Sequence, residues 1–207
     1  MRGWLHFWSF AVSIAACATM IAVSAALVGA AAAAATAVYS VTVLGLFGIS
    51  ALYHRHTWHS SRSRAVMRRL DHSMIFLFIA GSYTPVAVLA MDRPTAEWVL
   101  AVVWTGALAG VALKTLWPYA PAWVGVPIYV ALGWVAVFVL PDLLHNAGVA
   151  ALVLLLVGGA LYTLGAVAYA VHRPDPWPAV FGFHEVFHVL VIAAATVQFI
   201  GVAGVVL

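Results

Sequence analysis

Two histidines and a carboxylate stand close together near the end of the chain, as His184, Glu185 and His188. On an α-helix, His184 and His188 share one face, with Cβ atoms roughly 5–6 Å apart. Both imidazoles can then reach one metal ion at about 2.0–2.1 Å. A long apolar run follows them, and ionisable groups at membrane depth usually have a function and a partner. The spacing favours a metal site over a pair of histidines that face lipid headgroups.

The same residues match the H-E-x-x-H pattern of zinc proteases, in which Glu185 would be the general base. An intramembrane metalloprotease of this kind needs a third ligand downstream. The only strongly polar side chain in the remaining apolar run is Gln198. Glu185 also lies about 100° around the helix from His184. The protease stays a minor alternative, and we predict that Glu185 is not the catalytic base.

His54 is the expected third metal ligand, at the end of an earlier apolar run. Ser50 lies one helical turn before it, where its hydroxyl can hold a water or orient the histidine. A hydrogen bond from Ser50 to its own helix is an equally good alternative. Three further histidines compete for the metal: His56, His59 and His72.

Asp71 is the carboxylate that we expect to contact the metal through a water. Zinc lowers the pKa of a bound water to about 7, and a nearby carboxylate can take the proton as general base. Asp71 also precedes an apolar run, so it is a candidate N-cap of that helix. The two roles are compatible, because one oxygen can cap the helix while the other bonds water.

The elements that must position these residues are membrane helices. The 207-residue chain is 66% hydrophobic and only 7% charged, whereas a soluble surface alone needs about a quarter charged residues. We predict an all-α integral membrane protein, with one domain of seven transmembrane helices over residues 1–207 and no nucleic-acid partner. A span needs about 20 apolar residues. The predicted helices cover approximately 5–28, 34–54, 72–91, 97–116, 122–140, 147–171 and 183–206.

The basic residues set the expected orientation of this bundle. With a cytoplasmic N-terminus, eight of the nine Lys and Arg side chains fall on the inner side and only Arg93 falls outside. Basic residues favour cytoplasmic loops, so we predict the N-terminus inside and the C-terminus outside. This topology places His54, Asp71, His184 and His188 toward the same inner leaflet.

Several ordered motifs resemble the hemolysin III family, which belongs with the progestin and adipoQ receptors, including the adiponectin receptors. The resemblance implies a zinc held by His54, His184 and His188, a water between metal and Asp71, and a supporting Ser50. Glu185 is a departure, because adiponectin receptors carry an uncharged residue there. The motifs are Ser50-x-x-x-His54, Leu70-Asp71-His72-Ser73-Met74-Ile75, Gly81-Ser82-Tyr83-Thr84-Pro85 and His184-x-x-x-His188.

Two functions follow from these features. The first is a zinc-dependent hydrolase of a lipid amide or ester, with ceramidase-like chemistry implied by the resemblance, Asp71 and Ser50 as catalytic residues, and membrane lipids as partners. The second is a non-enzymatic cytolysin, channel or regulator of membrane state with a structural zinc. A water-filled pore needs polar residues along its whole length, whereas here they gather at one end, so the sequence disfavours a pore. The small size and short loops indicate a bacterial inner-membrane protein.

Overall fold

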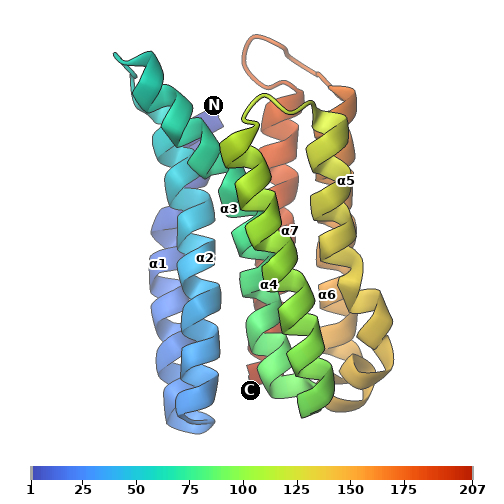
Figure 1. Ribbon diagram of the computed structural model, residues 1–207. Helices are drawn as coiled ribbons and strands as arrows, with labels where there is room; N and C mark the ends of the chain where they lie inside the picture. The colour runs from blue at the N-terminus through green and yellow to red at the C-terminus, as the bar shows by residue number, and fades with distance from the viewer. Residues whose placement is uncertain (1, 207) are drawn as a thin grey trace.

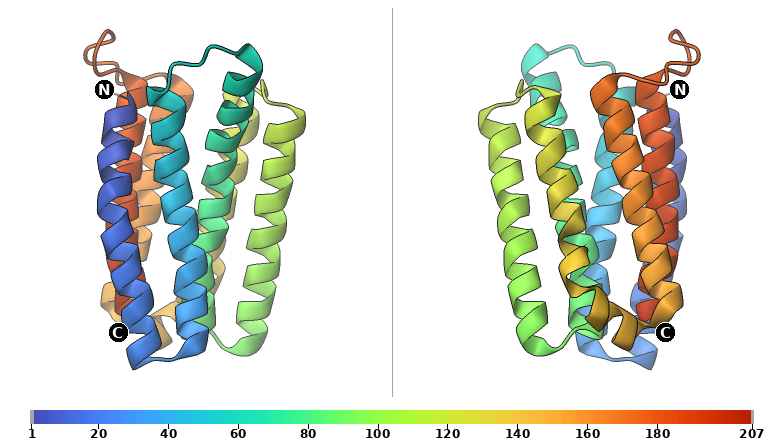
Figure 2. Two further views of the ribbon diagram at one scale, coloured as in Figure 1. Left: turned by 90° about the vertical axis from the view of Figure 1, so that its left-hand side faces the viewer. Right: turned by 90° about the vertical axis from the view of Figure 1, so that its right-hand side faces the viewer.

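The computed structural model describes residues 2–206, which form seven α-helices and one 3-10 helix. Neighbouring helices run antiparallel along one bundle axis (Figures 1 and 2). The elements are α1 (Arg2–Leu27), α2 (Ala30–Arg55), α3 (Ser61–Ala90), α4 (Arg93–Leu116), α5 (Ala122–Gly133), η1 (Trp134–Val139), α6 (Leu140–Val171) and α7 (Phe183–Val206).

The described residues include six helical stretches that are long and apolar enough to cross a membrane, so the chain is an integral membrane protein with a helical bundle. One of these stretches, Trp123–Val171, has 49 residues. At about 1.5 Å per residue it would be more than twice as long as the hydrocarbon core, about 30 Å thick, requires. Gly148, with φ 77° and ψ 169°, interrupts the helix, and α5 and α6 run in opposite directions (Figure 2).

The number of crossings and the side on which each end lies stay predictions. The first and last described residues lie at opposite ends of the bundle (Figure 1), as an odd number of crossings requires. His54 at the end of α2 and His184 at the start of α7 belong to the same end as the start of α1.

Side chains form hydrogen bonds to backbone groups at the junction between α5 and η1. Tyr83 of α3 donates its hydroxyl hydrogen to the Gly133 carbonyl at 2.6 Å and accepts a bond from the Ala136 amide at 2.8 Å. Trp134 donates to Thr163 Oγ1 on α6 at 2.9 Å. A backbone group without a partner costs several kcal/mol in hydrocarbon. These bonds therefore stabilise the passage from α5 into the 3-10 helix η1.

The start of α3 differs from the prediction. This helix begins at Ser61 rather than at about residue 72, with Ser60 as its N-cap, which accepts a bond from the Ser63 amide at 3.4 Å. Asp71 is therefore not the N-cap, because it lies inside the helix. An apolar run shows only the part of a helix that lies in the hydrocarbon core. Arg, Met and Leu are good helix formers, so the helix can extend beyond that run.

The remaining boundaries shift less. The helices α2, α4 and α6 begin at Ala30, Arg93 and Leu140, each several residues before the predicted start. The predicted helix over 122–140 is not continuous, because α5 ends at Gly133 and a 3-10 helix follows it. For α7, the predicted range of 183–206 agrees with the structure. Of the candidate spans, α3 has the largest buried share, and it packs between α2 and α4. This central helix carries Asp71 into the bundle.

Candidate metal centre

The last turn of α2 and the first turns of α7 bring three imidazoles together. His54, His184 and His188 each offer a ring nitrogen, and these nitrogens lie within 4.8 Å of one another. The ring centroids are 5.1 Å apart for His54 and His184, 5.2 Å for His54 and His188, and 4.8 Å for His184 and His188. The sequence-predicted ligand set is therefore one cluster in space.

The donor set fits a divalent metal such as zinc. Nitrogens that hold a tetrahedral zinc at about 2.0–2.1 Å are roughly 3.4 Å apart. The three ring nitrogens lie within 4.8 Å of one another, so rotation of the rings would have to bring them at most about 1.4 Å closer to reach bonding distance. Three neutral imidazoles are also the ligand set of open, catalytic zinc sites.

Two aromatic side chains outside the predicted ligand set pack against the histidine rings. His6 of α1 is only 3% exposed and stacks on His188, with centroids 4.0 Å apart and an interplanar angle of 17°. Tyr169 of α6 meets His184 edge-on at 5.6 Å. Neither role followed from spacing along the chain, because each depends on a helix packed against α7. One sequence signal for His6 is its polar ring within an apolar run.

Ser50 and Asp71 lie on facing helices, and both line the cavity that reaches the histidines. The Ser50 hydroxyl is within hydrogen-bonding reach of the Asp71 carboxylate. Ser50 is 4% exposed. The serine predicted to orient the histidine or a water thus lies beside the carboxylate.

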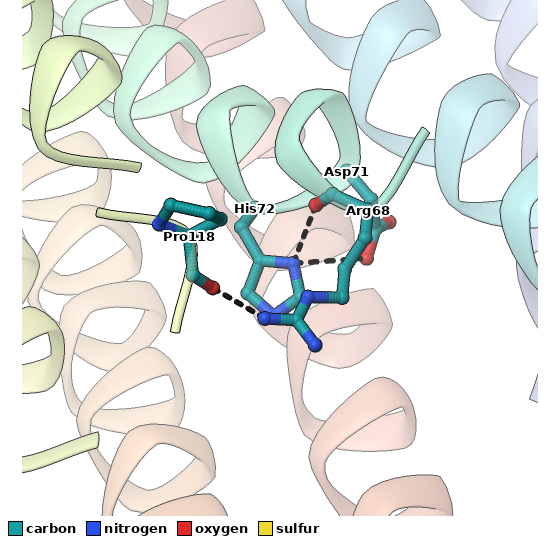
Figure 3. A network of polar contacts seen from close by, with 4 residues as sticks. All are labelled: Arg68, Asp71, His72 and Pro118. Carbon is teal, nitrogen blue, oxygen red and sulfur yellow. Dashed lines mark hydrogen bonds and ion pairs between the residues drawn. The ribbon is translucent and has the colours of Figure 1, made fainter. Parts of the chain in front are cut away.

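The competing histidines are not part of the cluster. His72 donates from Nδ1 to the Arg68 carbonyl at 2.7 Å, and this nitrogen lies 3.8 Å from Asp71 Oδ2 (Figure 3). His56 and His59 are exposed, and His56 meets the ring of Trp58 at 4.6 Å. This separates the three clustered histidines from the other candidates.

Glu185 caps its own helix. It occupies the third position of α7, and its Oε2 accepts a bond from the Gly182 amide at 2.9 Å. An acidic or amide side chain at this position commonly reaches back to the residue before the helix. Asp175 adds a second bond at this helix start, accepting from the Phe183 amide at 3.0 Å. These contacts give Glu185 a structural role in placing the histidines.

A cavity of about 770 Å³ extends from the histidine cluster into the bundle. Its deeper wall includes Phe78, Leu155, Tyr162 and Val191, and Gln198 contributes an amide. This volume lies within the roughly 300–1,000 Å³ of ordinary ligand sites. The cavity therefore offers an apolar compartment with the histidines and Asp71 at one end.

Comparison with known proteins places this site in a family context. A family model described as "Haemolysin-III related" matches residues 1–199, which include the histidine cluster, Ser50 and Asp71. The chain is 29% identical over 162 residues to "Hemolysin-3" of Bacillus cereus, covering 78% of this chain and 70% of that protein. It is 26% identical over 162 residues to "Hemolysin-3 homolog" of Bacillus subtilis (strain 168), covering 78% and 72%. It is 30% identical over 180 residues to "Heptahelical transmembrane protein ADIPOR2" of Oryza sativa subsp. japonica, covering 80% and 79%.

Proposed function

Because the chain belongs to the hemolysin III family, we propose that it is a zinc-dependent hydrolase that cleaves a lipid amide or ester within the membrane. The observation that carries this proposal is the position of the histidine cluster at the end of an apolar cavity inside the bundle. A scissile carbonyl would lie at the cluster while the acyl chain fills the cavity.

His54, His184 and His188 would hold the zinc. Three protein ligands leave a fourth position open, and zinc in such a site acts as a Lewis acid that activates water. Glu185 and Asp175 accept hydrogen bonds from the Gly182 and Phe183 amides and so fix the start of α7. His6 supports the ring of His188 by stacking. Together these contacts limit the movement of the two ligands on α7.

Asp71 would act as general base and Ser50 as its positioning partner. The carboxylate would accept a proton from the attacking water and pass it to the leaving amine or alkoxide. The Ser50 hydroxyl lies near the carboxylate from α2 and would fix which oxygen faces the water. An acyl chain in the cavity would exclude bulk water from the histidines, which strengthens electrostatic interactions in the site.

The proposed location is the cytoplasmic leaflet of a bacterial inner membrane. Most basic residues lie at the end of the bundle that carries the histidines, with Arg93 toward the other. This asymmetry supports a cytoplasmic site.

The test is hydrolysis of a panel of N-acyl and ester lipids by purified protein, beside the Asp71→Asn and His188→Ala variants. We expect release of fatty acid that a chelator abolishes, that zinc restores, and that both substitutions reduce by at least about a hundredfold. A matched surface substitution, Arg62→Gln, should leave turnover unchanged. Absence of metal-dependent turnover across the whole panel would reject the hydrolase.

A second function is membrane lysis, which the name "Hemolysin-3" of the Bacillus cereus relative favours. In that case the metal would be structural, and lysis would not need the histidines. Dye release from liposomes is the distinguishing measurement. Release that persists when all three clustered histidines are replaced by alanine would favour lysis over hydrolysis.

A further inference from the structure

Basic side chains line the same cavity, at the end of the bundle where the α2–α3 and α4–α5 loops lie. Of the four Asp, Glu, Lys and Arg residues among the described residues that line it, three are basic: Arg64, Arg68 and Lys114. The fourth is Asp71, which is within hydrogen-bonding reach of Ser50. We call Arg68 and Lys114 the cationic recess.

Lys114 is the most unusual member of this recess. It lies in the last turn of α4, yet it is only 9% exposed. A lysine near the end of a membrane helix ordinarily extends its ammonium toward water. Here the ammonium lies against α5, 2.6 Å from the position that a Cβ on Gly125 would occupy. Among the described residues, no carboxylate forms an ion pair with it.

Arg68 lines the same cavity as Lys114 and adds a second positive charge there. Its guanidinium donates to the Pro118 carbonyl (Figure 3) and lies over the ring of Tyr119, 4.3 Å from the centroid. A guanidinium has five N–H donors, so this single bond leaves most of them available for a ligand. The loop contacts therefore fix the orientation of Arg68.

Two neighbouring cations in a partly dry cavity repel each other and lose hydration. An anionic ligand between them would offset both costs. Arginine binds phosphate through paired N–H donors, and lysine adds a compact charge. The apolar compartment that continues from the recess suits an acyl chain. Recess and compartment together match a lipid with an anionic head.

We propose that Arg68 and Lys114 bind the phosphate of an anionic lipid whose acyl chain occupies the apolar part of the cavity. This inference goes beyond the hydrolase, because binding at the recess requires neither turnover nor metal. If the hydrolase proposal also holds, the recess would select phosphate-bearing substrates. A purely structural Lys114, which stabilises the C-terminal end of α4 through the helix dipole, would give no such preference.

The test is lipid-dependent thermal stability of the full chain in a neutral detergent, with and without chelator. Dioleoyl phosphatidylglycerol should bind about tenfold more tightly than dioleoyl phosphatidylcholine, because the choline ammonium of the latter offsets the charge of its phosphate and is repelled by the two cations of the recess. Lys114→Met and Arg68→Gln should each remove this preference. Lys114→Arg and the exposed control Arg62→Gln should keep it. If Lys114→Met does not fold, Arg68→Gln still decides the outcome.

Two further ligands identify the source of the anion. Inorganic phosphate alone should not reproduce the stabilisation, since it lacks the acyl chain. Oleate should stabilise the protein less than phosphatidylglycerol does. Equal binding of the two phospholipids, a preference unaffected by both recess variants, or stabilisation by phosphate or oleate that equals that of phosphatidylglycerol would overturn the proposal. Because the assay detects binding in chelated protein, a failed hydrolase assay would not affect it.

Discussion

Two carboxylates near the histidines have different surroundings. Glu185 is bonded to the Gly182 amide at the start of its own helix, whereas Asp71 lies on α3 within reach of Ser50. The H-E-x-x-H spacing alone would assign catalysis to Glu185. The helix cap explains instead why a carboxylate occurs between two metal-ligand candidates.

Paired substitutions distinguish these roles. Asp71→Asn keeps the shape of the side chain but removes the base, so we expect zinc content to persist while hydrolysis falls about a hundredfold or more. Glu185→Gln still accepts the bond from Gly182, so zinc content and turnover should stay close to wild type. Loss of zinc in Glu185→Gln beside an unaffected Asp71→Asn would reverse the assignment. Elemental analysis and the lipid assay provide the two measurements.

His6 is a positioning residue, and we expect it to affect the affinity for zinc rather than the chemical step. Its stacking on His188 is an interaction that contributes about 0.5–1.5 kcal/mol. We therefore expect His6→Ala to weaken zinc binding by about 2–10-fold, whereas His6→Phe should retain the stack and most of the affinity. Competition with a chromophoric chelator measures both. Equal zinc affinity in wild type and His6→Ala would show that the stack does not support the ligand.

At the scale of helices, apolar length predicted most of the fold. The range of α7 was predicted correctly, and helical spacing together with a shared bundle end predicted that His54 would meet His184 and His188. Apolar length could not place the start of α3, where a basic helix extends beyond the apolar segment. Spacing also could not predict His6, Tyr169 or the cationic recess, because these contacts depend on how separate helices pack.

The closeness of α2 and α3 depends on Gly81. A Cβ at this position would overlap the side chain of Thr42 on α2, and small residues allow such close approach between membrane helices. We expect Gly81→Val to destabilise the protein by about 1–3 kcal/mol and to separate Ser50 from Asp71. Gly204→Ala is the control, since a Cβ there meets nothing within 4 Å. Thermal unfolding of the protein in detergent should show a lower midpoint temperature for Gly81→Val but not for Gly204→Ala.

At the scale of the whole molecule, orientation decides which leaflet the site faces. The predicted topology places the N-terminus and the histidines on the cytoplasmic side. A phosphatase reporter, which is active only outside the cytoplasm, should be active when fused at the C-terminus and inactive when fused in the α2–α3 loop. The reverse pattern would move the proposed site to the outer leaflet.

The metal would also connect distant parts of the bundle. His54 and His184 are about 130 residues apart, and closing a long loop constrains the unfolded chain strongly. Metal held by both α2 and α7 should therefore raise the stability of the entire fold. Removal of the metal should lower the unfolding temperature of wild type but not that of a variant that lacks a ligand.

The most direct test of the account is the zinc content of purified, metal-replete protein, wild type beside His188→Ala, with thermal unfolding before and after chelation. We predict about one zinc per wild-type chain, a lower unfolding temperature after chelation, and little zinc in His188→Ala. Zinc below about a tenth of the protein in wild type, with no loss of stability on chelation, would contradict the metal centre.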